Sequence, residues 1–229
     1  SQHGIALFAT GDDHQPCGVF VPFLTHTRTT KLLRQQLSAP KPLTKRTWAA
    51  IVQSKIHNQS TCLRLSGKRG VSQLESYRRR VRSGDSTNME GQAAWAYFTQ
   101  LFGDEFRRGA DDWRNSALNY GYAVLRGTIT RSLVGHGFHP SVGLFHSSER
   151  NAFNLADDII EPFRPVVDLS VAKRDGNSDK IALTTEDKAY LISLLNVDVS
   201  LSNGKTSVLS AIDDVVTSIV RVFEQQDEA

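Results

Sequence analysis

The sequence contains no run of 18 or more apolar residues and only two cysteines among its 229 residues. The lack of long apolar runs excludes a membrane-spanning helix of the usual length. The N-terminal stretch SQHGIALFATGDDH lacks the basic flank and the cleavage pattern of a signal peptide. Cys17 and Cys62 fit a reducing compartment, and they do not by themselves imply a disulfide. We therefore expect a cytoplasmic globular protein that does not associate with membranes.

Several catalytic motifs are also missing, namely a glycine-rich phosphate loop, G-x-S-x-G, C-x-x-C and H-E-x-x-H. Serine or cysteine nucleophile catalysis therefore has no support. His136, His139 and His146 lie in the segment HGFHPSVGLFH, but their spacing matches no common zinc pattern. We interpret His136 and His139 as helix-cap or core residues. His146 stays a candidate ligand because it leads directly into an acidic segment.

Acidic residues are nearly absent from residues 21–84, where 14 Lys and Arg side chains accompany Glu75 alone. Residues 85–229 carry 13 basic and 21 acidic residues. This asymmetry predicts a partner of dense negative charge, and nucleic acid is the default because neutralised phosphates release counterions. A basic face without any polyanion is the alternative. The densest part of the basic segment weakens that alternative, and it consists of Arg78, Arg79, Arg80 and Arg82.

The apolar pattern predicts a mainly α-helical protein. The short β-rich runs GIALFAT and CGVFVPF flank the turn-forming GDDHQP, which predicts a β-hairpin over the first 23 residues. Helix 88–102 has hardly any polar face and is predicted to be largely buried. Helical periodicity continues from about residue 26, with CLRLSG as a short extended link. The predicted helices span 28–37, 43–57, 71–82, 88–102, 116–134, 150–161, 185–195 and 207–225.

The segment NAFNLADDIIEPFRP carries acids at the end of a helix. Pro162 predicts that the helix stops just before it. The polar residues of this segment share one helical face, and they are Asn154, Asp157, Asp158 and Glu161. Acids repel the negative end of a helix, so a positive group should lie nearby. Arg164, pairing locally, is one candidate, and a divalent cation held by a carboxylate and His146 is the other.

Glu90 begins the most apolar helix, and its spacing from Thr87 is that of a capping box. The alternative is a metal ligand, because a carboxylate beside so apolar a helix needs a partner. Magnesium and manganese ions prefer oxygen ligands, and manganese also accepts an imidazole. A glutamate, a histidine and a later acid form a chemically sensible set for such an ion.

The sequence contains the segments RNSALNYGYAVLRGTITRSLVGHGFHPSVGLFH and NAFNLADDIIEPFRPVVD. They resemble the core of the CRISPR-adaptation integrases, the "Cas-one" family, in the form found in type II systems, and weaker matches extend the resemblance over essentially the whole chain. It implies the remnant of an N-terminal β-domain at residues 1–24 and a multi-helix catalytic domain at residues 25–229. Family members carry further β-strands ahead of a segment like GIALFAT. We therefore expect a shortened β-domain, for which the usual dimerisation is not implied.

The resemblance implies a metal-dependent DNA integrase. Such a protein joins the 3′-hydroxyl ends of short DNA fragments to the CRISPR repeat by transesterification, with related endonuclease and disintegration activity on branched DNA. The implied Mg²⁺ or Mn²⁺ ligands are Glu90, His146 and Glu161, and Asp158 matches a second acid of some relatives. Asp157 is expected to stay outside the ligand set. Implied partners are double-stranded DNA, a "Cas-two" adaptation subunit and a second copy of the chain, as a homodimer or a dimer of dimers.

The basic segment is expected to grip the DNA backbone, which positions DNA without reading its sequence. The expected DNA-binding residues are Lys68, Arg69, Arg78, Arg79, Arg80, Arg82, Asn119, Tyr120 and Arg126. The last three lie in the matching motif, and helix packing is the alternative role for them. Two other functions remain open for the whole chain: a non-catalytic DNA-binding scaffold and a stand-alone metal-dependent nuclease.

Overall fold

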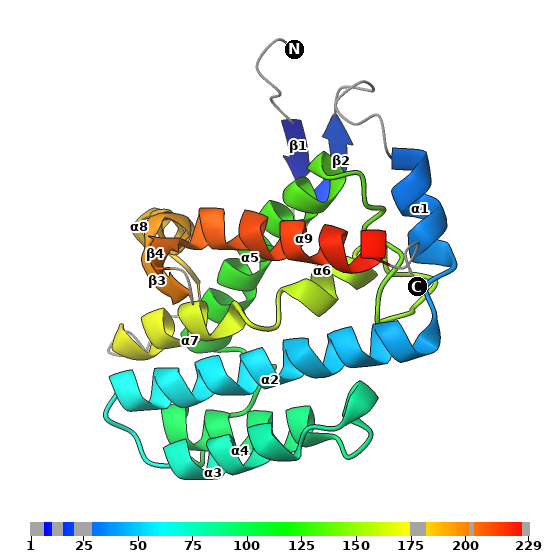
Figure 1. The fold of residues 1–229 in the computed structure, drawn as a ribbon. Helices are drawn as coiled ribbons and strands as arrows, with labels where there is room; N and C mark the ends of the chain where they lie inside the picture. The colour runs from blue at the N-terminus through cyan, green and yellow to red at the C-terminus, as the bar shows by residue number, and fades with distance from the viewer. Residues whose placement is uncertain (1–6, 11–15, 21–28, 175–181, 202–203, 226–229) are drawn as a thin grey trace.

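The computed structural model describes residues 7–10, 16–20, 29–174, 182–201 and 204–225, and this part of the chain is mainly helical, as predicted (Figure 1). Its helices are α1 (Thr29–Leu37), α2 (Lys41–Leu65), α3 (Val71–Arg80), α4 (Met89–Phe102), α5 (Trp113–Gly135), α6 (Asn154–Ile159), α7 (Arg164–Lys173), α8 (Thr185–Ser193) and α9 (Val208–Glu224), with short 3-10 turns at Ser83–Asp85 and Leu194–Asn196. Among the described segments, no helix combines the length and the apolar character that crossing a membrane requires.

The predicted N-terminal hairpin is present. Strand β1 (Leu7–Thr10) pairs antiparallel with β2 (Pro16–Phe20). The predicted domain boundary at residues 24 and 25 lies outside the described residues, so the division into two domains stays a prediction. A second hairpin, β3 (Asp198–Leu201) with β4 (Gly204–Ser207), was not predicted. The Asn203-Gly204 dipeptide in the sequence is a strong hairpin signal that could have revealed it.

Helix α2 is the central element of the helical part of the fold. Figure 1 shows it between the α3–α4 pair on one side and α6 and α7 on the other, and it packs against all four. Its buried stripe repeats at helical spacing, at Trp48, Val52, Ile56, Gln59 and Leu63. The expected extended link CLRLSG is wrong. Cys62 and Leu63 are buried and continue the stripe, so α2 runs on to Leu65 and ends before Gly67, whose φ is +64°.

Helix α5 crosses behind α9 in Figure 1 and contacts α7, α8 and α9. Its glycine at position 121 allows α7 to approach closely, because an added Cβ would lie 2.4 Å from Val167 Cγ1. The absence of a side chain at Gly121 therefore allows α5 and α7 to pack closely. Helix α9 closes the core with its buried stripe of Val208, Ala211, Ile212, Val216, Ile219 and Phe223.

Three sequence predictions about helices need correction. Helix α4 is only partly buried: Ala93 and Tyr97 are 0% exposed, but Trp95 is 74% exposed. The helix expected at 150–161 is shorter, since α6 begins at Asn154 and ends at Ile159. Helix α3 ends at Arg80 because Val81 adopts an extended conformation, with φ −61° and ψ 121°.

Candidate ion site and DNA-binding surface

Two carboxylates from distant parts of the chain meet at one ammonium group. Glu90 lies in the first turn of α4, Glu161 in the turn between α6 and α7, and Lys55 in the middle of α2. Lys55 Nζ is 2.5 Å from Glu90 Oε1 and 2.5 Å from Glu161 Oε2. The side chains of Lys55 and Glu161 are 8% and 7% exposed, whereas that of Glu90 is 28% exposed. Helix α2 thus holds a positive charge between two predicted metal ligands.

The start of α4 places Glu90 without using its side chain. The Asn88 side chain caps the helix by accepting the Gly91 N–H. The Asp85 carboxylate accepts the N–H groups of Met89 and Glu90, each at 2.9 Å. The predicted capping box between Thr87 and Glu90 is therefore wrong: Asn88 is the N-cap residue, and Asp85 accepts the Glu90 N–H that Thr87 was expected to accept. The carboxylate of Glu90 is left to pair with Lys55.

Glu161 is held by two cations. Arg164 Nε donates to Glu161 Oε1 at 2.9 Å, which confirms the local pairing expected from the sequence. Glu161 Oε2 is buried and lies 2.5 Å from Lys55 Nζ, so these two groups form a buried ion pair. Burial by itself raises the pKa of Glu161, but the charges of Lys55 and Arg164 outweigh burial and hold the pKa below its ordinary value. Burial similarly opposes the charge of Lys55, yet Glu161 and Glu90 raise the pKa of the ammonium.

His146 is oriented by a fully buried carboxylate. Asp158 Oδ1 lies 2.7 Å from His146 Nδ1 and also accepts the His146 N–H at 3.2 Å. Asp158 Oδ2 accepts the N–H groups of Leu144 and Phe145 at 2.6 and 3.1 Å. An ionised carboxylate can only accept, so we assign the proton to Nδ1, which leaves Nε2 as the ligand atom of the neutral ring. The hydrogen bond to Asp158 raises the pKa of His146 against the opposing effect of burial.

Aromatic contacts also hold the loop that carries His146. The ring of Phe145 stacks on that of Trp48 at a centroid distance of 4.4 Å, with 1° between the planes. Trp48 also meets the His146 ring edge to face at 5.9 Å. Since Trp48 is 1% exposed and belongs to α2, the loop carrying His146 is packed against the helix that carries Lys55.

Asp157, the third acid of the segment NAFNLADDIIEPFRP, pairs with an arginine. Arg126 of α5 donates from Nε to Asp157 Oδ1 at 2.7 Å and contacts Asp157 Oδ2 at 2.5 Å. Asn151 donates to the same carboxylate, and the Arg126 guanidinium lies 5.1 Å from the Phe153 ring centroid. The polar face predicted for this helix is thus buried, because each acid meets a partner from another element.

Comparison with known proteins identifies the family. The family model described as "CRISPR associated protein Cas1" matches residues 1–180. The chain is also 41% identical over 220 residues to the CRISPR-associated endonuclease Cas1 of Neisseria meningitidis serogroup C, covering 95% of this chain and 72% of that protein. This chain belongs to the Cas1 family. It spans a smaller share, 59%, of a Francisella tularensis subsp. novicida relative named CRISPR-associated endonuclease Cas1 1 that is 28% identical.

Solved structures share the fold of this Cas1-family chain. A casposase bound to integration product superimposes with a TM-score of 0.69 at 19% identity, over 100% of this chain and 78% of that one. A chain of the partial Cas6-RT-Cas1–Cas2 complex gives a TM-score of 0.74 at 19% identity, over 98% of this chain and 79% of that one. At this level of identity, these likenesses establish the fold.

The ligand set predicted from the Cas1 resemblance is partly assembled. The structure brings Glu90 and Glu161 together, whereas His146 faces Asp158. Across the described segments, no three His, Cys, Asp or Glu side chains are arranged to hold an ion. The donors nevertheless fit a hard cation, because two carboxylates already surround a positive charge and carboxylate oxygens are the ligands that such an ion prefers. Both oxygens of Asp158 accept N–H groups, which argues against its predicted place among the ligands and for a role in positioning His146.

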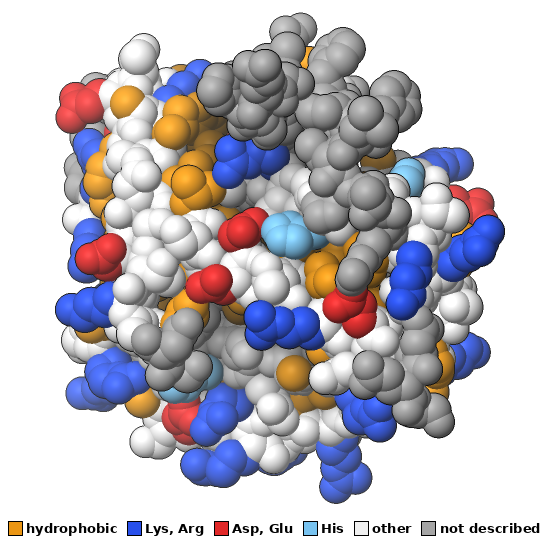
Figure 2. Space-filling model, turned by 45° about the horizontal axis from the view of Figure 1, so that its top comes forward, with side chains coloured by type: hydrophobic (Ala, Val, Ile, Leu, Met, Phe, Trp, Pro, Cys, Tyr) orange, Lys and Arg blue, Asp and Glu red, His pale blue; other side chains and the backbone are white. Residues whose placement is uncertain are grey.

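The predicted DNA-binding residues of the basic segment lie mostly on the surface. Exposed side chains among them are Lys68, Arg69, Arg79, Arg80 and Arg82. Arg78 is half-buried and pairs with Glu75 at 2.8 Å. Figure 2 shows Lys and Arg side chains along the lower edge of the molecule, the edge on which α2, α3 and α4 lie in Figure 1. The surface thus offers several cations to a polyanion close to the helix that carries Glu90.

The residues of the LNYGYAVLR motif divide between the surface and the interior. Asn119 is exposed, and its Oδ1 accepts from Arg108 at 2.7 Å. Arg108 also donates to Asn115, so two side chains of α5 hold this exposed arginine in place. Tyr120 is half-buried under Lys188, and Arg126 makes the packing contact with Asp157 described above. Sequence reasoning missed Arg108, for which only its charge beside the motif was a signal.

Lys55 was missed as well, although the sequence carried a signal. It lies one residue before the buried Ile56 and three after the buried Val52, so it falls on the apolar stripe of its helix. A lysine at such a position needs an acidic partner. The partners come from α4 and from the turn after α6, and sequence spacing does not reveal that these two elements flank α2.

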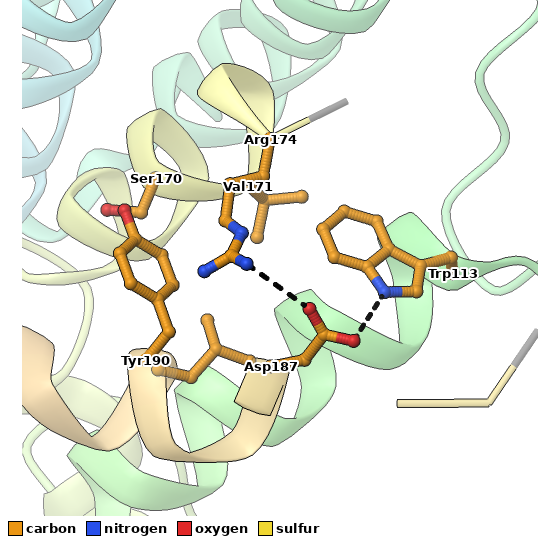
Figure 3. Close-up of a pocket in the computed structure, with 7 residues that line it drawn as sticks. Trp113, Ser170, Val171, Arg174, Asp187 and Tyr190 are labelled. Atoms are coloured by element: carbon orange, nitrogen blue, oxygen red, sulfur yellow. Dashed lines mark hydrogen bonds and ion pairs between the residues drawn. The ribbon is translucent and has the colours of Figure 1, made fainter. Parts of the chain in front are cut away.

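A pocket lies where α5, α7 and α8 meet, and none of the predicted site residues lines it. Figure 3 shows the Arg174 guanidinium between Tyr190 and Asp187, at 4.3 Å from the tyrosine ring centroid and 3.8 Å from Asp187 Oδ1. The Trp113 indole donates to Asp187 at 3.3 Å. Asp187 also forms the capping box of α8 with Thr184. This cluster therefore joins α8 to α5 and α7.

Proposed function

We propose that this chain is a metal-dependent DNA integrase of CRISPR adaptation. It would join the 3′-hydroxyl ends of short DNA fragments to the repeat by transesterification and would cleave or disintegrate branched DNA at the same site. The observation that carries the proposal is the meeting of Glu90 and Glu161 around one cationic position. Membership of the Cas1 family, whose curated relatives are named endonucleases, supports it.

Glu90, Glu161 and His146 Nε2 would hold a Mg²⁺ or Mn²⁺ ion. Such an ion supplies Lewis-acid activation of the attacking hydroxyl and stabilises the charge that develops on the phosphorus oxygens. Asp158 keeps Nε2 of His146 available by engaging Nδ1. Arg164 holds the Glu161 carboxylate in its orientation through Oε1.

The reaction exchanges one phosphodiester bond for another. The oxygen of the fragment's 3′-hydroxyl forms a bond to phosphorus, and the bond from that phosphorus to the 3′ oxygen of the repeat strand breaks. The proton lost by the attacking hydroxyl is balanced by the proton gained by the leaving oxygen. Because one phosphodiester bond forms for each one that breaks, no ATP is required. When water takes the place of the hydroxyl, the same exchange is hydrolysis.

Backbone contacts fit a protein that accepts fragments of varied sequence. The exposed cations of the α3 region, Arg79, Arg80 and Arg82, would neutralise phosphates of DNA that reaches Glu90. Each neutralised phosphate strengthens binding by counterion release, and binding should weaken as salt rises.

The proposed partners are double-stranded DNA, a Cas2 adaptation subunit and a second copy of the chain. Two fold neighbours support the first two: a casposase bound to integration product and a Cas6-RT-Cas1–Cas2 complex. We propose a homodimer or a dimer of dimers as the working assembly.

The test is strand transfer of a labelled duplex into a repeat-containing DNA with Mn²⁺ present. Glu161→Ala should abolish joined product, because it removes one of the two carboxylates that define the site. Glu149→Ala is the matched control, since it removes an exposed carboxylate from the segment between His146 and α6. Unchanged joining by Glu161→Ala would remove this residue from the mechanism.

The same assay separates the two other functions. A non-catalytic scaffold would shift DNA on a gel in a salt-dependent way and give no joined product. A stand-alone nuclease, which the name of the Neisseria relative favours, would give cleavage products without joined ones.

A further inference from the structure

Lys55 occupies the position at which the two carboxylates converge. Its ammonium lies 2.5 Å from an oxygen of each, and its side chain is 8% exposed. A buried ion pair is weak evidence for a purely stabilising role, because desolvation of the charges offsets much of their attraction. The position therefore needs an explanation beyond stability.

Lys55 Nζ lies where an ion bound to the same two oxygens would lie. A magnesium ion lies about 2.0–2.1 Å from its oxygen ligands. An ion bound to Glu90 Oε1 and Glu161 Oε2 on the side that Lys55 occupies would lie almost where its Nζ now lies, because the nitrogen is 2.5 Å from both atoms. On that side, the ammonium and the ion compete for the same two oxygens.

The charge of the cluster leads to the same conclusion. Two carboxylates, Glu90 and Glu161, are matched by two cations, Lys55 and Arg164, so the cluster is neutral without a metal. Adding a divalent ion beside both cations would leave a net charge of about +2 in a largely buried place, which is unfavourable. Withdrawal of Lys55 halves that excess, whereas Arg164 binds the other oxygen of Glu161 and need not move.

The backbone of Lys55 is held in place, whereas its ammonium can move. One turn further along α2, Asn58 donates to the Pro162 carbonyl at 2.7 Å, which holds the helix against the turn that carries Glu161. A lysine side chain is a flexible chain of four carbons, so the ammonium can move while the helix stays in place. Glu90 is 28% exposed, which makes its side of the cluster the open one.

We propose that Lys55 is a positioning residue of the ion site: its ammonium holds Glu90 and Glu161 together while no ion is bound, and a divalent cation binds by displacing it. The inference rests on the proposed function, because it assumes that an ion binds these carboxylates. The consequence is that the site binds the ion more weakly than the two carboxylates would without Lys55. The ion binds to both carboxylates only as the ammonium leaves them.

The first test is calorimetric titration of the full chain with Mn²⁺. Lys55→Met keeps the side-chain length and removes the competing charge, so it should bind Mn²⁺ at least about tenfold more tightly than the wild type. Lys41→Met is the matched control, because it removes the same charge from an exposed position of α2. The control should stay within about twofold of the wild type, since solvent and salt screen exposed charges.

The outcomes separate the inference from the function on which it rests. Mn²⁺ binding to the wild type with equal or weaker binding to Lys55→Met overturns the inference and leaves the integrase proposal standing. If neither protein binds Mn²⁺, both proposals are contradicted. Thermal unfolding adds a check: Lys55→Met should melt below the wild type in EDTA, and Mn²⁺ should raise its melting temperature by more.

Two further experiments cover a Lys55→Met variant that does not fold. Lys55→Gln retains an N–H donor for the carboxylates without the charge, and it should also bind Mn²⁺ more tightly than the wild type. The second uses wild-type crystals soaked in Mn²⁺, in which anomalous scattering locates the ion. The inference expects Lys55 Nζ to have left both carboxylates, and an ammonium still bridging Glu90 and Glu161 beside the bound ion overturns it.

Discussion

Asp158→Asn tests whether Asp158 acts by positioning the His146 imidazole. Asp158 is 0% exposed and accepts four N–H groups, from His146 twice and from Leu144 and Phe145. An asparagine in either orientation turns one acceptor oxygen into an NH₂ group that faces two donors. At about 1–3 kcal/mol for each of the two buried donors left unsatisfied, the variant should lose about 2–6 kcal/mol of unfolding free energy.

The catalytic effect follows from the imidazole. With Nδ1 no longer held, the His146 ring loses its fixed orientation, and loss of such a supporting carboxylate typically reduces metal affinity or activity 10- to 100-fold. We expect that reduction in strand transfer, measured at a temperature where urea unfolding shows the variant to be fully folded.

The control is a double-mutant cycle with His146→Ala. If Asp158 acts through the imidazole, adding Asp158→Asn to His146→Ala should reduce the rate little further. Wild-type strand transfer by Asp158→Asn would refute the positioning role. Independent, multiplying losses in the double variant would refute the route through His146.

Three further predictions concern stability and DNA binding. Burial raises the pKa of Asp168 to about 6 from an ordinary 3.8, even though two tyrosine hydroxyls donate to it. The stabilising contribution of this carboxyl is therefore complete below about pH 4 and is lost as pH rises through about 6. Relative to Asp168→Asn, the wild type should lose up to about 3 kcal/mol of unfolding free energy between pH 4 and pH 8, and a difference in urea unfolding that does not change with pH would contradict this. Asp187→Ala removes the cap of α8 and the acceptor of the Trp113 indole, so urea unfolding should show a loss of about 2–4 kcal/mol with DNA affinity unchanged. Replacing the exposed Arg79 and Arg80 with alanine should lower the slope of log affinity against log salt by up to about 2, and a slope equal to that of the wild type would place DNA elsewhere.

The helices were predictable where one apolar stripe decides the structure. Helix α9 has such a stripe and begins within one residue of its predicted start. The sequence did not predict the end of α2 correctly, because CLRLSG contains two leucines and its helix-disfavouring residues come only at its end. Such a short apolar pattern fits a strand or a helix equally well. The early start predicted for α6 failed because Asn151 binds Asp157 and Phe153 locally and precedes the helix.

The candidate site was predictable through its motifs and not through its geometry. Glu90 and Glu161 stood out as acids beside apolar segments, but their common partner Lys55 depends on how α4 and the turn after α6 pack against α2. The role of Asp158 likewise depends on the path of the loop that carries His146, which brings backbone N–H groups onto its oxygens. The local Arg164 pair was predictable, because it spans only three residues.

The central claim is that Glu90, His146 and Glu161 hold one divalent ion between them. Electron spin echo spectroscopy of the Mn²⁺-loaded protein tests it directly, because an imidazole nitrogen bound to manganese modulates the echo. The account predicts a nitrogen signal in the wild type that is lost in His146→Ala, while Glu161→Gln loses the tightly bound ion. Tightly bound Mn²⁺ whose signal is unchanged by both substitutions would contradict it.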